Sequence, residues 1–210
     1  RARYGSLGLQ IDMFDHTAFK IPPAEAYIMD PHQRLAMEEA YVALSASGLN
    51  RSSLMNSVTG VFAGLWPGDY VSVLPKRGAV ASGPFAVAAT GPAMLVGRIS
   101  YVLGMQGPCI AYDTACSAAL SAFQGAMCAL RNEDGDAALV FGVNVMCDST
   151  TSQLFAAAQM TSPTGKSHAF DARANGYALS RIHLSEPTRR TPISDAVFCL
   201  KSIRKPPRTM

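Results

Sequence analysis

Three short runs without a charged residue alternate along the chain with longer segments that have helical periodicity. The runs cover residues 58–64, 109–112 and 137–145. A continuous apolar run of this length is typical of a strand that is buried on both sides, as in parallel sheets. The alternation therefore predicts a layered α/β fold, with helices covering both faces of the sheet.

Capping signals place the first long helix at about residues 31–47. Asp30 can act as its N-cap, Pro31 suits the first helical position, and Gln33 is able to reach back as in a capping box. Gly48 is a natural C-terminal stop. The apolar stripe expected on this helix consists of Met37, Tyr41 and Leu44.

Two further helices follow from similar signals. Gly91-Pro92 begins one that ends at Gly104. Asp113 and Thr114 turn the chain into another, in which large apolar residues repeat at helical spacing and predict the buried face. These residues are Leu120, Phe123, Met127 and Leu130.

Composition predicts one folded domain followed by a segment of different character. The chain has 210 residues, of which 49% are hydrophobic and 16% charged, which is enough apolar material for a compact core. Residues 181–210 hold seven Lys or Arg against two acidic residues, a net +5, which leaves −2 of the overall +3 for residues 1–180. Because the basic charge is confined to the end of the chain, we expect no nucleic-acid partner.

Cysteine usage and one uncharged stretch bear on the compartment. The five cysteines form no CxxC pair and nothing at the N-terminus resembles a secretory signal, so we expect a reducing, intracellular environment. Residues 78–97 carry no charge over twenty positions, which is long enough to span a bilayer. This stretch contains four glycines and two prolines and few large apolar side chains, so we expect a buried loop and helix and no membrane span.

Cys116 stands where a predicted strand turns into a predicted helix. The free N–H groups and the macrodipole of a helix N-terminus favour a thiolate over a thiol. A strand-to-helix turn also carries a side chain to the end of the sheet, where substrate can reach it. However, a lone cysteine in an alanine-rich stretch is more often a small buried hydrophobe, so position alone leaves both interpretations open.

Five ordered blocks in the sequence resemble those of β-ketoacyl synthases. The block D-T-A-C-S at 113–117, followed by small residues, resembles their nucleophile motif. The other blocks are M-D-P-H-Q-R-L at 29–35, G-V-F-A-G at 60–64, G-R-I-S-Y at 97–101 and F-D-A-R-A-N-G-Y at 170–177. The resemblance covers about Tyr4 to Ser180. It favours the nucleophile interpretation of Cys116.

The resemblance implies a thiolase-like layered α/β fold, of which this chain is the N-terminal half. It divides the chain into a ketosynthase N-terminal domain at 1–180, incomplete at its start, and a divergent, poorly ordered basic tail at 181–210. In this family the catalytic cysteine, here Cys116, takes an acyl group from an acyl carrier protein. A malonyl-type extender is then decarboxylated and condensed with that group. No metal or bound cofactor is implied, because phosphopantetheine of the carrier protein holds the acyl and malonyl-type thioesters, and the complete enzyme is expected to be a homodimer.

The chain also departs from the family pattern. The two histidine blocks that support decarboxylation are absent, and His16, His32, His168 and His183 lie in no such context. The glycine-rich continuation expected after Tyr177 is replaced by the basic tail. We therefore expect acylation of Cys116 and not full condensation, in a truncated or frame-shifted relative from polyketide or fatty acid biosynthesis.

Two alternative functions stay open from sequence. One is a non-catalytic scaffold or dimerisation module that keeps the fold, and the other is a cysteine hydrolase that pairs Cys116 with His168 or His183.

Four other residues have less specific expectations. Arg34 and Arg98 could contact a carrier protein, although a solvated or structural salt-bridging role is the favoured interpretation. Trp66 and Tyr70 either line an acyl channel or pack the core. Asp113 is expected to cap a helix.

Overall fold

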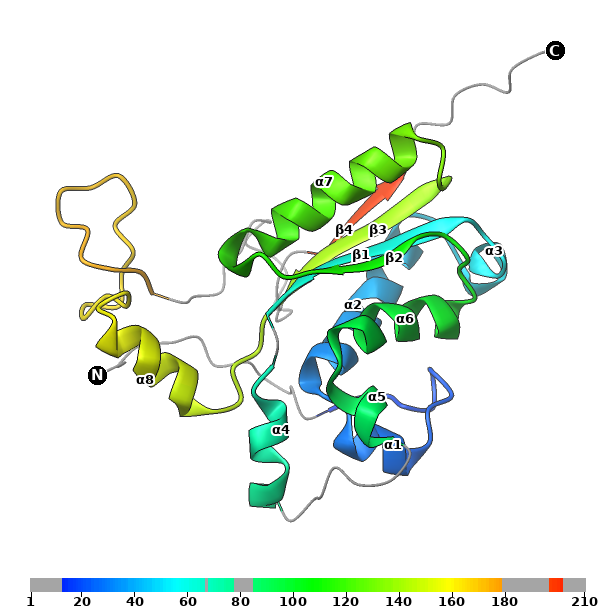
Figure 1. Cartoon of the computed structure of the whole chain (residues 1–210). Helices are drawn as coiled ribbons and strands as arrows, with labels where there is room; N and C mark the ends of the chain where they lie inside the picture. The colour runs from blue at the N-terminus through cyan, green and yellow to red at the C-terminus, as the bar shows by residue number, and fades with distance from the viewer. Residues whose placement is uncertain (1–12, 67, 78–84, 179–196, 202–210) are drawn as a thin grey trace.

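The computed structural model describes residues 13–66, 68–77, 85–178 and 197–201. Its centre is a four-stranded sheet in the order β2-β1-β3-β4 (Figure 1). The strands are β1 (Thr59–Leu65), β2 (Cys109–Tyr112), β3 (Ala137–Val143) and β4 (Val197–Lys201). Strand β1 pairs in parallel with β2 and β3, whereas β4 runs antiparallel to β3. The three predicted strands and the predicted α/β class are therefore confirmed.

The parallel strands end at one edge of the sheet. Gly64 near the end of β1 is in register with Tyr112, the last residue of β2, and with Gly142 near the end of β3. In parallel α/β sheets ligands bind outside the carboxyl ends of the strands. This edge is therefore the first place to look for a functional site.

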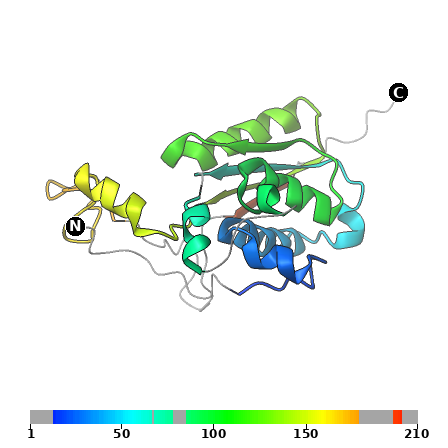
Figure 2. The same cartoon turned by 60° about the horizontal axis from the view of Figure 1, so that its bottom comes forward.

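One face of the sheet is covered by two helices, α2 (Pro31–Ala46) and α6 (Pro92–Leu103), as Figures 1 and 2 show. The largest cluster of buried hydrophobic residues lies between these helices and the sheet. Short helical segments lie around it: α1 (Pro23–Ile28), α3 (Arg51–Leu54), α4 (Tyr70–Val73), η1 (Pro75–Arg77) and α5 (Ala86–Thr90).

Helix α2 begins and ends as predicted. The carboxylate of Asp30 accepts a hydrogen bond from the backbone N–H of His32 at 2.8 Å, Pro31 is the first helical residue, and Gly48 has a positive φ of 74° just beyond the C-terminus. The predicted capping role of Gln33 is wrong, because this side chain is buried and donates a hydrogen bond to the carbonyl of Ala88. Met37 and Leu44 are buried as expected, but Tyr41 is exposed. Helix α6 ends at Gly104, whose left-handed conformation matches the predicted stop.

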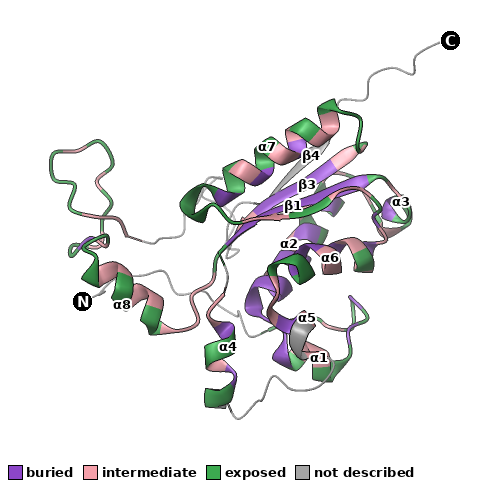
Figure 3. Cartoon of the chain, in the orientation of Figure 1, coloured by how far each residue is buried: buried purple, intermediate pink, exposed green. Residues whose placement is uncertain are grey.

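The other face of the sheet is covered by α7 (Ala118–Arg131). The residues of this helix that are buried are Ala118, Ala122 and Ala126. The predicted buried stripe is wrong at Leu120, which is 71% exposed, and at Phe123, which is 36% exposed. Leu130, by contrast, is partly buried and packs against the cluster on this face. Figure 3 shows exposed positions along the side of α7 that faces away from the sheet. Alanines therefore form the fully buried part of the contact between α7 and the sheet, with Leu130 packed beside them.

Helix α8 (Ser149–Ala157) and the following segment to residue 178 extend away from the sheet (Figures 1 and 2). Thr161 and Tyr177 form an isolated β-bridge that closes this segment into a loop. We refer to residues 149–178 as the arm. Most of the predicted basic tail lies outside the described residues, apart from β4, and so does the 78–84 part of the uncharged stretch. None of the helices in the described part of the chain is long and apolar enough to cross a membrane.

Candidate nucleophile at the carboxyl end of the sheet

Cys116 lies between the end of β2 and the start of α7, within a short 3-10 helix, η2 (Ala115–Ser117). Cys116 is exposed to solvent. The preceding Ala115 has a positive φ of 55°, a conformation that non-glycine residues rarely adopt and that often occurs at functional sites. The position of Cys116 at a strand-to-helix turn is the predicted one, and the structure does not bury its side chain in an apolar interior.

A local hydrogen-bond network holds this turn. The carbonyl of Thr114 accepts hydrogen bonds from the backbone N–H of Ser117 at 3.3 Å and from its hydroxyl at 2.8 Å. The hydroxyls of Thr114 and Ser121 lie 2.9 Å apart, which ties the turn to α7. Asp113 does not cap α7 as predicted. Its carboxylate instead accepts a hydrogen bond from the N–H of Ala115 at 3.3 Å, so it stabilises the turn before the helix.

The helix N-terminus next to Cys116 has no side-chain cap. Neither Thr114 at the start of η2 nor Ser117 at the start of α7 makes a cap hydrogen bond. By contrast, Asp30, Asn50 and Asp148 each accept a backbone N–H at the helix they precede. A helix N-terminus without a side-chain cap keeps its N–H groups and its partial positive charge available to an anion. Such a helix N-terminus is suited to stabilising a developing oxyanion.

Two glycines determine how closely α7 approaches the sheet. A Cβ added to Gly64 would lie 2.5 Å from the Cα of Ala119, and one added to Gly142 would lie 2.7 Å from the Cβ of Ala119. Because Gly64 and Gly142 are register partners, the neighbouring strands leave a joint recess for the first turn of α7. This recess sets the position of Cys116 relative to the end of the sheet.

Tyr177, at the end of the arm, interacts electrostatically with Cys116, which sequence reasoning did not identify. Burial raises the pKa of the Tyr177 hydroxyl, and the negative charge of Cys116 raises it further. Phe155 packs edge-on against the Tyr177 ring at a centroid distance of 6.5 Å. Tyr177 ends the F-D-A-R-A-N-G-Y block, but nothing in that block indicates an interaction with a residue about sixty positions earlier.

Arg34 and Arg98 have the structural role that was favoured for them. Arg34 is buried and its guanidinium donates to the carbonyl of Met29 at 2.9 and 2.6 Å and to the hydroxyl of Tyr70 at 3.2 Å. Arg98 pairs with Glu25 and donates to the side chain of Gln33 at 3.0 Å. Both arginines therefore connect segments of the fold and do not present a basic surface.

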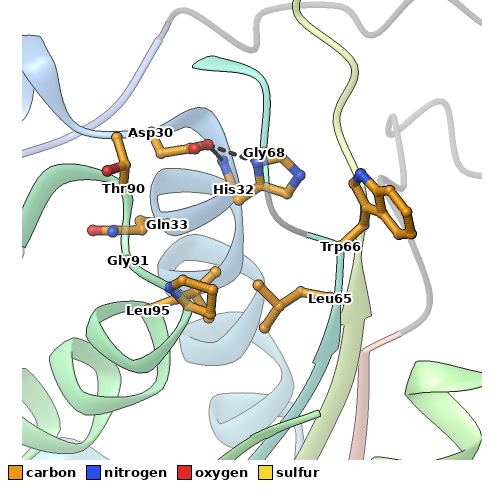
Figure 4. Close-up of a pocket in the computed structure, with 10 residues that line it drawn as sticks. Asp30, His32, Gln33, Leu65, Trp66, Gly68, Thr90, Gly91 and Leu95 are labelled. Carbon is orange, nitrogen blue, oxygen red and sulfur yellow. Dashed lines mark hydrogen bonds and ion pairs between the residues drawn. The ribbon is translucent and has the colours of Figure 1, made fainter. Parts of the chain in front are cut away.

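Tyr70 packs in the core, whereas Trp66 is 44% exposed and lines a small pocket (Figure 4). The pocket also includes Asp30, His32 and Gly68. Among the described residues no histidine forms a hydrogen bond with Cys116, so the hydrolase hypothesis gains no support; His183 lies outside the described residues. No group of three or more His, Cys, Asp or Glu that could hold a metal ion occurs in the described ranges.

Comparison with known proteins identifies the family. The sequence profile described as "Beta-ketoacyl synthase, N-terminal domain" matches residues 1–181. The chain is 41% identical over 168 residues to the highly reducing polyketide synthase easB of Emericella nidulans, covering 80% of this chain and 7% of that protein. It is 42% identical over 164 residues to a mycocerosic acid synthase-like polyketide synthase of Mycolicibacterium smegmatis, covering 78% of this chain and 8% of that protein.

Solved structures agree with the sequence matches. The ketosynthase from module 6 of the bacillaene synthase of Bacillus subtilis superimposes with a TM-score of 0.74 at 30% identity, covering 92% of this chain and 30% of that one. An oxazolomycin ketosynthase domain from Streptomyces albus gives the same TM-score and identity over 83% of this chain and 30% of that one. The chain thus spans about 7% of the length of its curated relatives and about 30% of the ketosynthase structures. It belongs to the β-ketoacyl synthase N-terminal domain family and has the corresponding part of the thiolase-like fold.

Proposed function

We propose that this chain is the N-terminal part of a ketosynthase of polyketide biosynthesis and that Cys116 accepts the acyl group. The observation that carries the proposal is the position of Cys116. It is exposed, it lies at a helix N-terminus without a side-chain cap, and it follows a parallel strand at the carboxyl edge of the sheet. The polyketide assignment is supported by relatives that are polyketide synthases.

The acyl transfer that we assign to Cys116 is a thioester exchange. The thiolate attacks the carbonyl carbon of an acyl group held on the phosphopantetheine of an acyl carrier protein. The negative charge moves to the carbonyl oxygen, where the backbone N–H of Cys116 is one available donor. A donor of this kind contributes roughly 3 kcal/mol to transition-state stabilisation. When the tetrahedral intermediate collapses, the bond to the pantetheine sulfur breaks and this sulfur leaves as a thiolate that takes up a proton.

The second half-reaction would decarboxylate a malonyl-type extender, so that carbon dioxide leaves and the resulting carbanion attacks the acyl-Cys116 thioester. A carbon–carbon bond would form and the Cys116 thiolate would be released. Neither histidine block that supports this step in the family occurs in the sequence. We therefore assign only the first half-reaction to residues of this chain.

We also propose that the complete enzyme is a homodimer that uses the edge of the sheet at β2. No strand among the described residues pairs with the outer side of β2, and Ile110 on this strand is 41% exposed. On the neighbouring α6, Tyr101 is 88% exposed. An unpaired edge strand with exposed apolar side chains is suited to pairing with a second copy.

The proposal is tested by treating the chain with an acyl-N-acetylcysteamine thioester, which mimics the pantetheine donor, and locating the acyl group by mass spectrometry. We expect the acyl group on Cys116 and none in the Cys116→Ala variant. Iodoacetamide should modify Cys116 about tenfold faster than Cys109 and Cys128, which are exposed internal controls. Equal labelling of all cysteines would contradict the proposal.

The second candidate function is a non-catalytic scaffold or dimerisation module. It is favoured by the missing histidine blocks and by the apolar outer side of α7, which carries Leu120 and Phe123. A chain that self-associates but takes no acyl group from the thioester would support this alternative.

A further inference from the structure

A buried pair of side chains, Asp30 and His32, connects the start of α2 to the segment that leaves β3. Both residues are only 3% exposed. The Nδ1 atom of His32 lies 2.6 Å from Oδ1 of Asp30, and the backbone N–H of Val145 points to Nε2 at 2.8 Å (Figure 4 shows the Asp30–His32 bond). Because a backbone N–H can only donate, Nε2 must be the acceptor and Nδ1 must carry the proton. The geometry thus selects one neutral tautomer of His32.

Asp69, which follows the end of β1, holds the same segment from a second direction. Its Oδ1 accepts the N–H of Cys147 at 2.9 Å and its Oδ2 accepts the N–H of Asp148 at 2.8 Å. Residues 144–148, which we call the β3 exit, therefore have three backbone N–H groups bound by side chains of distant segments. Such bonds fix a backbone that has no regular secondary structure.

The two anchors pack closely against each other at Gly68. A Cβ added to this glycine would lie 2.7 Å from Oδ2 of Asp30 and 3.0 Å from Cε1 of His32. The segment that carries Asp69 therefore passes directly over the Asp30–His32 pair. The Asp30–His32 pair and Asp69 therefore hold the β3 exit together.

The β3 exit joins two segments that interact with Cys116 or with the helix turn that follows it. On its N-terminal side, Gly142 adjoins Ala119 in the first turn of α7. On its C-terminal side, it leads into α8 and the rest of the arm (Figure 1). Tyr177 at the end of the arm interacts electrostatically with Cys116. A change in the direction of the β3 exit would therefore move the arm, and Tyr177 with it, relative to the nucleophile.

We infer that His32 and Asp69 are positioning residues for acyl transfer to Cys116, acting by holding the β3 exit and the arm in one orientation. This inference rests on the proposed function of Cys116. Neither residue is assigned contact with the acyl group. Their effect is expected on the rate of transfer at saturating thioester, because displacement of supporting structure by about 1 Å can slow a reaction by up to about a hundredfold.

Two conservative variants of His32 separate positioning from packing. In the His32→Gln variant the amide oxygen can accept the N–H of Val145 as Nε2 does, whereas the His32→Asn variant keeps only the donor to Asp30. We expect H32Q to transfer the acyl group within about twofold of the wild-type rate and H32N to be slower by about tenfold. Hydrogen exchange of the Val145 amide should be faster in H32N and unchanged in H32Q. Equal rates in the two variants, whether both fast or both slow, would overturn the inference.

Asp69 provides an independent test if the H32N variant does not fold. Asp69→Asn keeps one acceptor oxygen and loses the other, so we expect acyl transfer to be slower by about tenfold, with exchange increased at Cys147 or Asp148. The matched control is Asp134→Asn, at an exposed acidic residue outside the site. An unchanged rate in D69N would overturn the inference. A wild-type chain that takes no acyl group would instead contradict the proposed function, so the two failures are distinguishable.

Discussion

The two faces of the sheet are covered in different ways. On the face toward α2 and α6, the strands β1 and β3 present mainly large side chains, namely Val61, Ala63, Leu65, Leu139, Phe141 and Val143. On the face toward α7 they present Phe62, Ala138 and Val140, followed by the glycines at 64 and 142. On the first face, large side chains of the strands pack against the helices. On the second face, the strands have glycines near their ends, so the backbone of α7 can come close to the sheet. The larger buried side chains and the proposed nucleophile are thus associated with opposite faces of the sheet.

The largest effect should come from truncating a large residue on the α2 and α6 face. Phe141 and Phe62 are each 1% exposed and lie on neighbouring strands, but they point to opposite faces. Phe141→Ala should lower the free energy of unfolding by about 4–5 kcal/mol, because its cavity is enclosed by the main cluster. Phe62→Ala should cost about 3 kcal/mol, because α7 can move toward the smaller cavity. Denaturant unfolding measures the free energy of unfolding of both variants. Equal losses in the two variants would contradict the difference between the faces.

A smaller but more specific effect is expected from Gly64→Ala on the α7 face. The added methyl group would meet the backbone of Ala118 and Ala119, which has no alternative rotamer. We expect a loss of about 2–3 kcal/mol in unfolding free energy and slower acylation of Cys116, because the start of α7 must shift. The matched control is Gly97→Ala in α6, where no atom lies within 4 Å of the added Cβ. That change should stabilise the chain by about 0.5–1 kcal/mol through helix propensity.

The features that sequence could predict have local causes. The N-cap at Asp30, the helix ends at Gly48 and Gly104 and the strand-to-helix turn at Cys116 each depend on residues within a few positions. Their signals are therefore present in a short window of sequence. The family resemblance then supported one of the two interpretations of Cys116.

The features that sequence reasoning missed depend on what lies opposite in space. The apolar periodicity of α7 is real, but the glycines at 64 and 142 bring the first turn of this helix close to the sheet through Ala118 and Ala119, and Leu120 and Phe123 are exposed. In the same way, the His32 ring meets an N–H that is 113 positions away in the chain. No periodicity or local motif encodes such a partner. Which residues of α7 are buried, and which group binds the His32 ring, both depend on packing between segments that are distant in the sequence.

Within the well-covered face, Glu38 of α2 predicts a weak dependence of stability on pH. Burial raises the pKa of this carboxyl above 4.5, with smaller opposing and reinforcing effects from the backbone and side chain of Asp15. The folded state then binds the proton more tightly than the unfolded state, so this group lowers stability as pH rises through and above 4.5. Glu38→Gln should therefore stabilise the chain at pH 7 by less than about 1 kcal/mol. Denaturant unfolding of the wild type and the variant at pH 7 and pH 4 checks this. If the variant gained more unfolding free energy at pH 4 than at pH 7, the expected pH dependence would be contradicted.

The outer side of α7 should show the smallest effect on stability and the clearest effect on association. Leu120 and Phe123 are exposed in this chain, so the double variant L120Q/F123Q should change the unfolding free energy by no more than about 0.5 kcal/mol. Their apolar surface favours self-association, which the polar residues should reduce in sedimentation velocity measurements. Tyr101→Gln on α6 serves as the comparison, because Tyr101 is also exposed but lies next to the β2 edge. If only Y101Q reduces association, the edge of the sheet is the interface, and the outer side of α7 contributes nothing to it.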